Sequence, residues 1–171
     1  MSQRSIVFPH DQKWIEMFKQ ESERLRTCLP LVHIRHIGST AIPGIYAKPI
    51  IDMLGEADDL RSVEVNTPRL VELGYEAMGE FGIPGRRYFR KDVDGERKFH
   101  LHVFETDSEE AKRHLRFRDY LKAHPKQARE YSGLKLKLVR ECEGNIDRYM
   151  DGKDPFIREI DKLAARFYGE R

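Results

Sequence analysis

The amino-acid sequence predicts an α+β protein, in which a β-sheet is flanked by helices and followed by a helical carboxyl-terminal layer. Two patterns carry this prediction. Residues 30–105 contain short β-rich runs separated by Gly, Pro and Asp, which is typical of a sheet of about four or five strands. Residues 106–171 keep helical apolar spacing instead. The length of 171 residues suits a single domain over 1–171 that holds both regions.

A helix precedes the sheet-rich region, which opens with a strand. Residues 11–29 repeat apolar side chains at helical spacing, and residues 31–37 then have the pattern of a strand. This strand is interrupted at residues 38–40, Gly-Ser-Thr. A proline and a glycine limit residues 41–47 to a turn or a short helix.

The next strand contains a charge inside an apolar run. Residues 49–54 are almost wholly apolar, the pattern of a strand buried on both faces, yet Asp52 lies among them. Burying an unpaired carboxylate is costly. Asp52 is therefore predicted either to pair with a base such as Lys48 or to have a function.

A helix and a hairpin complete this region. A helical segment is predicted to follow Asp58 and Asp59. It is predicted to restart at residues 67–68, where Thr-Pro resembles an N-cap followed by proline, and to end at Gly74. Residues 87–91 and 97–104 are β-rich runs separated by a turn at residues 94–95. That turn is Asp-Gly, a strong hairpin signal.

The helical layer is predicted to contain three helices. A capping-box pattern at residues 106–109 opens the first, which stops before Pro125. An apolar stripe over residues 128–138 marks the second. The dipeptide Asp154-Pro155 is predicted to open the last.

Composition excludes several classes of protein. Lys and Arg total 31 against 29 Asp and Glu, which argues against a protein that holds long nucleic acid by charge alone. No apolar run approaches the roughly 18 residues of a membrane span, and the amino terminus lacks a secretion pattern. The two cysteines, Cys28 and Cys142, are far apart and suit small apolar residues in a reducing compartment. We expect a cytoplasmic protein that binds no membrane.

The strongest local feature combines the turn at Gly38 and Ser39 with the buried charge of Asp52. A Gly-Ser turn at a strand end lets backbone N–H groups approach an anion, and hydroxyls add donors. A carboxylate on a neighbouring strand can hold a divalent cation against the same phosphate. The alternative is an ordinary tight turn with a capping hydroxyl.

The sequence resembles the GrpB family, within the nucleotidyltransferase (polymerase-β-like) superfamily, in residues 36–45, HIGSTAIPGI, and 47–52, AKPIID. Further matching pieces are Tyr88-Phe89, His100–Val103, Phe117–Leu121, His124-Pro125, Tyr131 and Leu134-Lys135. The resemblance implies a nucleotidyltransferase-like mixed β-sheet flanked by helices. It also implies that residues 38–40 hold a nucleotide or phosphorylated metabolite, with Asp52 and Ser39 as catalytic residues.

In the superfamily pattern, the first Asp is followed two residues later by a second carboxylate. The sequence departs from this pattern, because the residue two positions after Asp52 is Leu54. Two-metal phosphoryl transfer needs closely spaced oxygen ligands, and Asp52 alone cannot supply them. His100 and His102 project from one face of a strand because strand side chains alternate. If that strand lies beside the Asp52 strand, the three residues form a metal site for Zn²⁺, Mn²⁺ or Fe²⁺ in preference to Mg²⁺. The alternatives are direct substrate contact or a histidine pair that hydrogen-bonds across the sheet.

Further candidates for binding phosphate are Gly38, Ser39, Thr40, Lys48, Arg87 and Lys135. Lys48 suits a point charge on a phosphate or a surface salt bridge. Arg87 is the residue most suited to an anionic ligand within a basic cluster that is otherwise predicted to be a solvated hairpin, namely Arg86, Arg87, Arg90, Lys91, Arg97 and Lys98. Lys135 either reaches the cleft or pairs with Glu130. His36 is predicted to support the loop structurally.

Two main functions follow as hypotheses. In the first, the protein binds a nucleotide or phosphorylated metabolite with a divalent metal (Mg, Mn or Zn) and transfers a nucleotidyl group to a small acceptor. In the second, it is a non-catalytic nucleotide- or coenzyme A-related binding module, which Leu54 favours; GrpB-like domains also occur fused to dephospho-coenzyme A kinases. A metal-dependent phosphoesterase is a third hypothesis. The sequence predicts neither the nucleotide, the acceptor nor the oligomeric state.

Overall fold

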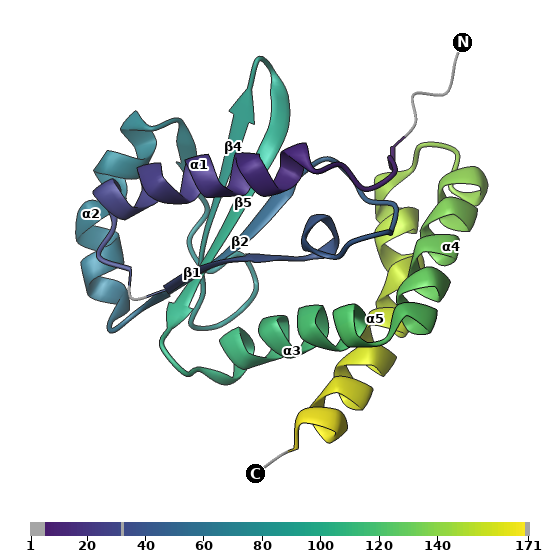
Figure 1. The fold of residues 1–171 in the computed structure, drawn as a ribbon. Coiled ribbons are helices and arrows are strands. Elements are labelled where there is room, and N and C mark those ends of the chain that lie inside the picture. The colour runs from purple at the N-terminus through teal and green to yellow at the C-terminus, as the bar shows by residue number, and fades with distance from the viewer. Residues whose placement is uncertain (1–5, 32, 170–171) are drawn as a thin grey trace.

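The computed structural model, which describes residues 6–31 and 33–169, contains a five-stranded mixed sheet (Figure 1). Its strands are β1 (His33–Ile37), β2 (Ile51–Ala57), β3 (Tyr75–Ala77), β4 (Arg87–Val93) and β5 (Glu96–Glu105). They lie in the order β1-β2-β5-β4-β3. The pair β2–β5 is parallel and every other neighbouring pair is antiparallel. The predicted α+β class with a mixed sheet is confirmed.

Helices cover both faces of this sheet. The first two are α1 (Lys13–Cys28) and α2 (Leu60–Glu72), and the last three are α3 (Glu109–Ala123), α4 (Pro125–Glu141) and α5 (Ile146–Tyr168). Figure 1 shows α1 and α3 on opposite sides of the strands, with α4 and α5 stacked beyond one edge. All the described strands thus precede residue 106, and the three helices that follow form the carboxyl-terminal layer.

Strand alternation divides the apolar core between the two faces. Met53 and Leu101 are fully buried against α1 and α2. Leu54, one residue after Met53, packs on the opposite face with Phe104 and Ala111 of α3. Side chains two residues apart on a strand share a face, so Asp52 points to the α3 side. The site therefore lies between the sheet and the carboxyl-terminal helices.

The predicted restart of a helix at Thr67-Pro68 is wrong, because α2 runs unbroken through Pro68. Its N-cap is Asp59, whose side chain accepts a hydrogen bond of 2.7 Å from the backbone N–H of Ser62. The Thr67 hydroxyl donates to the carbonyl of Val63, one turn earlier, as a threonine in the interior of a helix does.

The predicted start of the last helix at Asp154-Pro155 is also wrong, because α5 begins at Ile146. Asn145 is the N-cap and accepts a hydrogen bond of 3.0 Å from the backbone N–H of Arg148. Tyr149 before the proline and Ile160 after it are both buried. This burial on both sides outweighs the backbone hydrogen bond that Pro155 cannot make.

The remaining elements agree with the sequence prediction or refine it. The 3₁₀ helix η1 (Ser39–Ala41) lies at the predicted break of the strand, and the turn expected within 41–47 is found at residues 43–44. The helix predicted from residue 106 has Ser108 as its N-cap, and the strand β3 was not predicted individually. The Asp94-Gly95 hairpin turn is confirmed, with both residues at positive φ.

Both cysteines are free thiols. Cys142 is buried and Cys28 partly buried among apolar side chains, as predicted. No helix in the described ranges combines the length and the apolar character that crossing a bilayer requires.

Candidate functional site

The centre of the candidate site is a carboxylate flanked by two imidazoles. Asp52 on β2 lies directly beside His100 on the parallel strand β5, so the predicted adjacency of these strands is confirmed. The Asp52 Oδ1 atom lies 3.3 Å from His100 Nδ1 and 3.5 Å from His102 Nε2. One ligand atom from each residue lies within 4.8 Å of the others. Pleating alone places the two histidines on one face.

Gly38 permits this arrangement by its lack of a side chain. Its backbone has φ +71° and ψ −170°, a region that is nearly exclusive to glycine. A Cβ atom here would lie 2.8 Å from Asp52 Oδ2, closer than any ordinary contact. Gly38 is therefore the residue against which the Asp52 carboxylate packs, and any larger residue would displace that carboxylate.

Asp52 is held in its charged form. Burial alone would raise the pKa of its carboxyl, but hydrogen bonds and charges from His100 and His102 outweigh burial and hold the pKa well below its usual range. Its side chain is 31% exposed, so a ligand can reach it. A carboxylate with two imidazoles is a donor set that Zn²⁺, Mn²⁺ and Fe²⁺ accept, and these residues therefore fit a divalent metal.

Three lysines stand around this centre. A pocket of about 270 Å³ is lined by Asp52 and both histidines together with cationic, hydroxyl and apolar groups. Its other lining residues are Ser39, Thr40, Lys48, Ile50, Lys135, Tyr149, Met150 and Lys153. The lysines come from the loop before β2, from α4 and from α5. Three lysines against a single carboxylate make the pocket suited to an anion.

Lys135 is the most buried of these lysines, at 2% exposure. Its Nζ atom donates to the Ser39 hydroxyl and, at 3.1 Å, to the carbonyl of Tyr46. It lies 4.1 Å from the centre of the Tyr131 ring. Burial, aided by repulsion from the other lysines, moves its pKa well below the usual range. Of the two alternatives predicted for Lys135, the structure therefore supports the first: the side chain reaches the cleft and does not pair with Glu130.

Lys48 and Lys153 share the ring of Tyr149. Their Nζ atoms lie 4.7 and 4.8 Å from its centre. Burial and the nearby Lys48 lower the pKa of Lys153 to about 8, although Asp52 opposes this shift. Burial likewise lowers the pKa of Lys48. Lys48 thus faces the pocket, and the alternative of a surface salt bridge is not seen.

His36 supports the loop, as predicted. Its Nε2 atom lies 2.8 Å from Thr40 Oγ1, and its ring stacks on Phe18 at 5.0 Å. The Thr40 hydroxyl also donates to the carbonyl of Ile50, so its hydrogen bonds are made within the protein. Burial lowers the pKa of His36 to about 4 and keeps the ring neutral near pH 7. The loop that presents Ser39 is therefore held from behind.

Arg87 is not brought into the pocket. Its guanidinium donates to Glu64 of α2 at 2.6 Å, and the residue is absent from the pocket lining among the described residues. The neighbouring Arg86 is buried instead and donates to the other ring nitrogen of His102, Nδ1, at 3.3 Å. His114 of α3 lies against His102 with ring centres 5.6 Å apart. Burial lowers the pKa of His114 to about 3.

Sequence reasoning missed Lys153, Tyr149, Arg86 and His114. Lys153 and Tyr149 precede Asp154, where the last helix was predicted to start. They were therefore not recognised as helical residues that line the pocket together with Met150. Arg86 was assigned to a solvated hairpin. A helical reading from Asn145 onward would have placed residues 149 and 153 four apart on one face.

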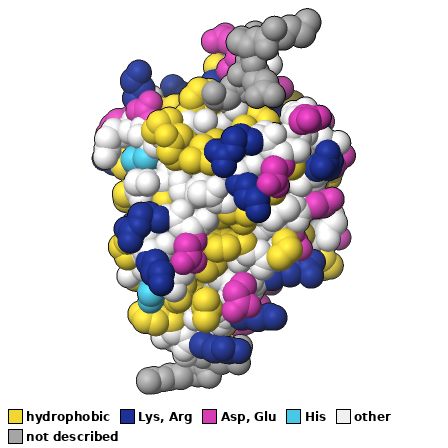
Figure 2. All heavy atoms as spheres, turned by 90° about the vertical axis from the view of Figure 1, so that its right-hand side faces the viewer, with side chains coloured by type: hydrophobic (Ala, Val, Ile, Leu, Met, Phe, Trp, Pro, Cys, Tyr) yellow, Lys and Arg dark blue, Asp and Glu magenta, His cyan; other side chains and the backbone are white. Residues whose placement is uncertain are grey.

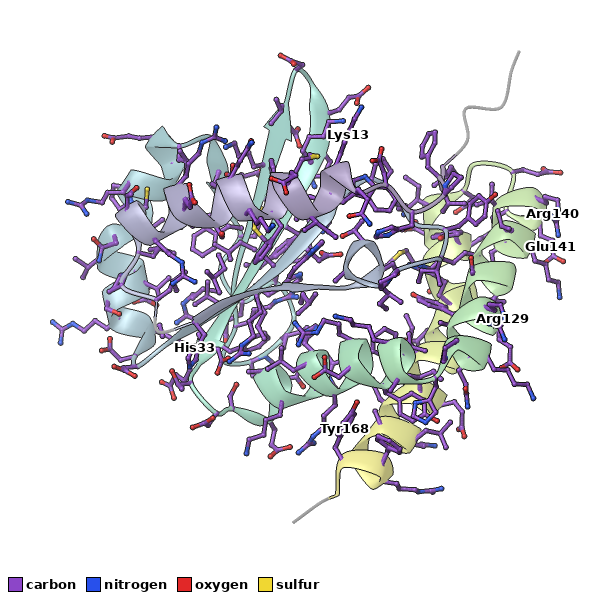
Figure 3. The ribbon with its side chains drawn as sticks, viewed as in Figure 1. Lys13, His33, Arg129, Arg140, Glu141 and Tyr168 are labelled. Atoms are coloured by element: carbon purple, nitrogen blue, oxygen red, sulfur yellow. The ribbon has the colours of Figure 1, made fainter. Side chains whose placement is uncertain are left out.

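The outer surface differs in character from the pocket. Figure 2 shows basic and acidic side chains interspersed over the face formed by the carboxyl-terminal helices, among the atoms drawn in colour. Figure 3 shows Arg129, Arg140 and Glu141 projecting from α4 away from the sheet. A larger hollow of about 690 Å³ beside α3 and α5 contains Arg113, which pairs with Glu110 and Asp161. The three lysines gather in the pocket instead.

Known proteins share this fold and sequence. A crystal structure of a conserved GrpB protein from Enterococcus faecalis matches with a TM-score of 0.91 and 39% identity, over 95% of this chain and 99% of that one. The UPF0157 protein YqkA of Bacillus subtilis is 42% identical over 94% of this chain. The glutamate-rich protein GrpB of Alkalihalophilus pseudofirmus is 37% identical over 91% of this chain and 92% of its own.

Relatives of this chain include longer proteins. The chain spans about half of the B. subtilis relative, 47% of its length. It also matches 48% of a dephospho-CoA kinase from Mycobacterium leprae at 27% identity. The family model for the GrpB protein matches residues 5–163. With that match and with relatives above 30% identity over nearly its whole length, the chain belongs to the GrpB family.

Proposed function

We propose that the protein binds a nucleotide or phosphorylated metabolite against a divalent metal and transfers a nucleotidyl group from it to a small acceptor. One observation carries the proposal: Lys48, Lys135 and Lys153 line a single pocket together with Asp52 and its two histidines. This arrangement pairs a site for a cation with a site for an anion. A metal-bound phosphate ester is the ligand class that satisfies both.

Electrostatics favour an anion beside the lysines. Within the described residues, none of the three lysine side chains forms an ion pair with a carboxylate, and the repulsion between them when protonated contributes to the lowered pKa values of Lys135 and Lys153. A phosphate would replace that repulsion by attraction in a partly dehydrated pocket. Lys48 and Lys153 are both half-buried, and their Nζ atoms lie over the Tyr149 ring in the lining of the same pocket.

The residues divide the work of binding. Asp52, His100 and His102 would hold the metal, which when bound polarises a phosphoryl oxygen and neutralises developing charge. Lys48 and Lys153 would orient the phosphates, and the Ser39 hydroxyl lies at the same pocket wall. Catalysis by such a site depends on positioning and charge neutralisation.

Thermal denaturation with ligands tests the binding. We expect ATP with Mn²⁺ to stabilise the protein by about 3 kcal/mol at a hundredfold excess over its dissociation constant. Asp52→Asn should lose the part of the stabilisation that depends on Mn²⁺. Asp92→Asn is the matched control, because Asp92 pairs with Arg97 on the exposed hairpin. If no nucleotide and metal combination shifts the melting temperature, or if Asp52→Asn responds like the wild type, the proposal fails.

A binding module without catalysis is the second candidate, and Leu54 favours it. This residue is fully buried with Phe104 on the face where a second carboxylate would stand, so the described part of the chain offers one metal site here and not two. The similarity to dephospho-CoA kinases would make a coenzyme A precursor a ligand to screen. Release of pyrophosphate from ATP that requires Asp52 would decide for the enzyme. Ligand stabilisation without release, over a panel of small acceptors, would decide for the binder.

A further inference from the structure

The hydrogen bond between Lys135 and Ser39 brings together an amine and a hydroxyl, two groups that can act as a base and a nucleophile. Lys135 Nζ is hydrogen-bonded to Ser39 Oγ, and its one other hydrogen-bond partner among the described residues is the carbonyl of Tyr46. Neither partner carries a charge. A buried lysine whose neighbours are neutral is costly to keep protonated. Lys135 is thus a lysine that its surroundings press toward the neutral amine, the form that can accept a proton.

Ser39 is open on the other side. It is half-buried and lines the pocket with Asp52 and the lysines. The 3₁₀ helix η1 begins at Ser39, and the loop is anchored from behind by His36 through Thr40. A hydroxyl that contacts an amine inside the protein and faces the ligand cavity satisfies the geometric requirement for an activated nucleophile.

We propose that Lys135 is the general base for Ser39, and that Ser39 Oγ attacks the phosphorus atom of a bound phosphate ester to form a covalent seryl ester. The inference rests on the proposed function for the ester and goes beyond it in assigning a covalent intermediate. Group transfer then takes two steps, with Ser39 as the first acceptor. Lys135 and Ser39 are both catalytic residues in this scheme.

Each step balances. In the first, the Oγ–phosphorus bond forms, the bond from phosphorus to the leaving oxygen breaks, and the leaving group departs with the electron pair. The Ser39 proton passes to Lys135 Nζ, which becomes an ammonium group. In the second, the hydroxyl of an acceptor or of water attacks the same phosphorus and releases its proton to solvent. Lys135 returns its proton to Oγ as the Oγ–phosphorus bond breaks.

A phosphorus electrophile tests the pair without any knowledge of the natural ligand. Diisopropyl fluorophosphate is neutral, and its attack by Oγ releases fluoride while Lys135 takes the proton. The full chain is treated with this probe in the presence of a chelator, and intact mass and peptide mapping follow the label. We expect one label per wild-type chain, on Ser39. The Ser39→Ala variant should carry no label.

Variants of Lys135 test the base. Lys135→Met removes the amine. Lys135→Arg introduces a guanidinium group, which stays protonated and so cannot accept a proton near neutral pH. General-base catalysis contributes about a hundredfold or more, so both should label about a hundredfold more slowly. Lys137→Gln, on the exposed side of the same helix, is the matched control and should label at the wild-type rate. A wild-type label elsewhere or nowhere, or a slowing below tenfold in Lys135→Arg, would overturn the inference.

The wild-type pH profile decides the matter if the Lys135 variants do not fold. A lysine base with a lowered pKa makes the labelling rate level off at a pH below the ordinary titration range of lysine. A rate that rises in proportion to hydroxide through pH 10 would sink the idea. Since the assay contains neither metal nor nucleotide, failure of labelling alongside normal ATP stabilisation rejects only the seryl ester. Normal labelling without ATP stabilisation rejects only the proposed ligand.

Discussion

Two lysines buried on opposite faces of the sheet have opposite surroundings. On the side of α1 and α2, Lys91 donates to Glu21 at 2.9 Å, and Glu21, with no exposed surface, also accepts from Tyr75 and Arg24. On the side of the carboxyl-terminal helices, Lys135 has only the neutral partners described above. A buried charge whose bonds are all made supports the fold. A buried lysine without a counter-ion is suited to bind a ligand or, as the neutral amine, to accept a proton.

The largest expected effect comes from breaking the paired side. Glu21→Ala removes the acceptor that Lys91, Tyr75 and Arg24 share and leaves Lys91, which is 12% exposed, without a counter-ion. Removing one partner of a buried pair costs about 3–5 kcal/mol. Urea denaturation should show this loss of unfolding free energy. Binding of ATP and Mn²⁺ by the folded fraction should stay unchanged, and a loss below 1 kcal/mol would contradict the assignment of this cluster to stability.

Gly38→Ala should have the next largest effect, this time on the other side. The positive φ of Gly38 costs a side chain about 1–3 kcal/mol, and the added Cβ would push on the Asp52 carboxylate. We expect both a loss of stability in that range and a loss of Mn²⁺-dependent stabilisation.

A second glycine provides the control for this substitution. Gly133 of α4 is exposed, and a Cβ there would meet no atom within 4 Å. Gly133→Ala should raise the unfolding free energy by about 0.5–1 kcal/mol, because alanine favours the helix, and should leave Mn²⁺ binding intact. If Gly38→Ala behaves like Gly133→Ala, the close approach to Asp52 has no consequence.

The sequence reveals the strand half of the site better than the helical half. Asp52 was recognisable because a charge inside an apolar run needs an explanation. The placement of His100 and His102 on one face of a strand follows from strand alternation alone. The hairpin was predictable from Asp94-Gly95. These features depend on neighbours in sequence, where local rules hold.

The cationic wall depends on tertiary packing instead. Lys48, Lys135 and Lys153 are separated by up to 105 positions (153 − 48) and meet only because α4 and α5 pack beside the sheet. Two prolines also misled the prediction, since Pro68 and Pro155 both lie inside helices. Proline disfavours the interior of a helix locally, and burial of apolar residues on both sides overrides that preference.

A rise in pH should lower the affinity for ATP and raise the unfolding free energy of the ligand-free protein. The pKa of Lys153 is about 8 in the folded protein against about 10.5 for an ordinary lysine, so above pH 8 it loses the charge that attracts a phosphate. Affinity for ATP, whose phosphates are ionised throughout, should fall about tenfold between pH 7 and pH 9.

Stability without ligand should show the opposite trend. The unfolded chain binds more protons than the folded one between pH 8 and 10.5, so the contribution of Lys153 to stability rises with pH over that window. Isothermal titration and urea denaturation at several pH values measure the two trends. Lys153→Arg, which stays charged, should flatten the fall in ATP affinity. An equally steep fall in that variant would show that another group is responsible.

The smallest expected change in stability completes the contrast between the two lysines. Lys135→Met keeps the length of the side chain and removes a buried amine that is costly to protonate. The loss of its bonds to Ser39 and to the carbonyl of Tyr46 offsets that gain, so the unfolding free energy at pH 7 should change by less than about 1 kcal/mol. Lys91→Met, which leaves Glu21 buried without its closest cation, should cost several times as much. Urea denaturation of both variants measures the difference, and equal losses would mean that Lys135 belongs to the framework of the fold just as Lys91 does.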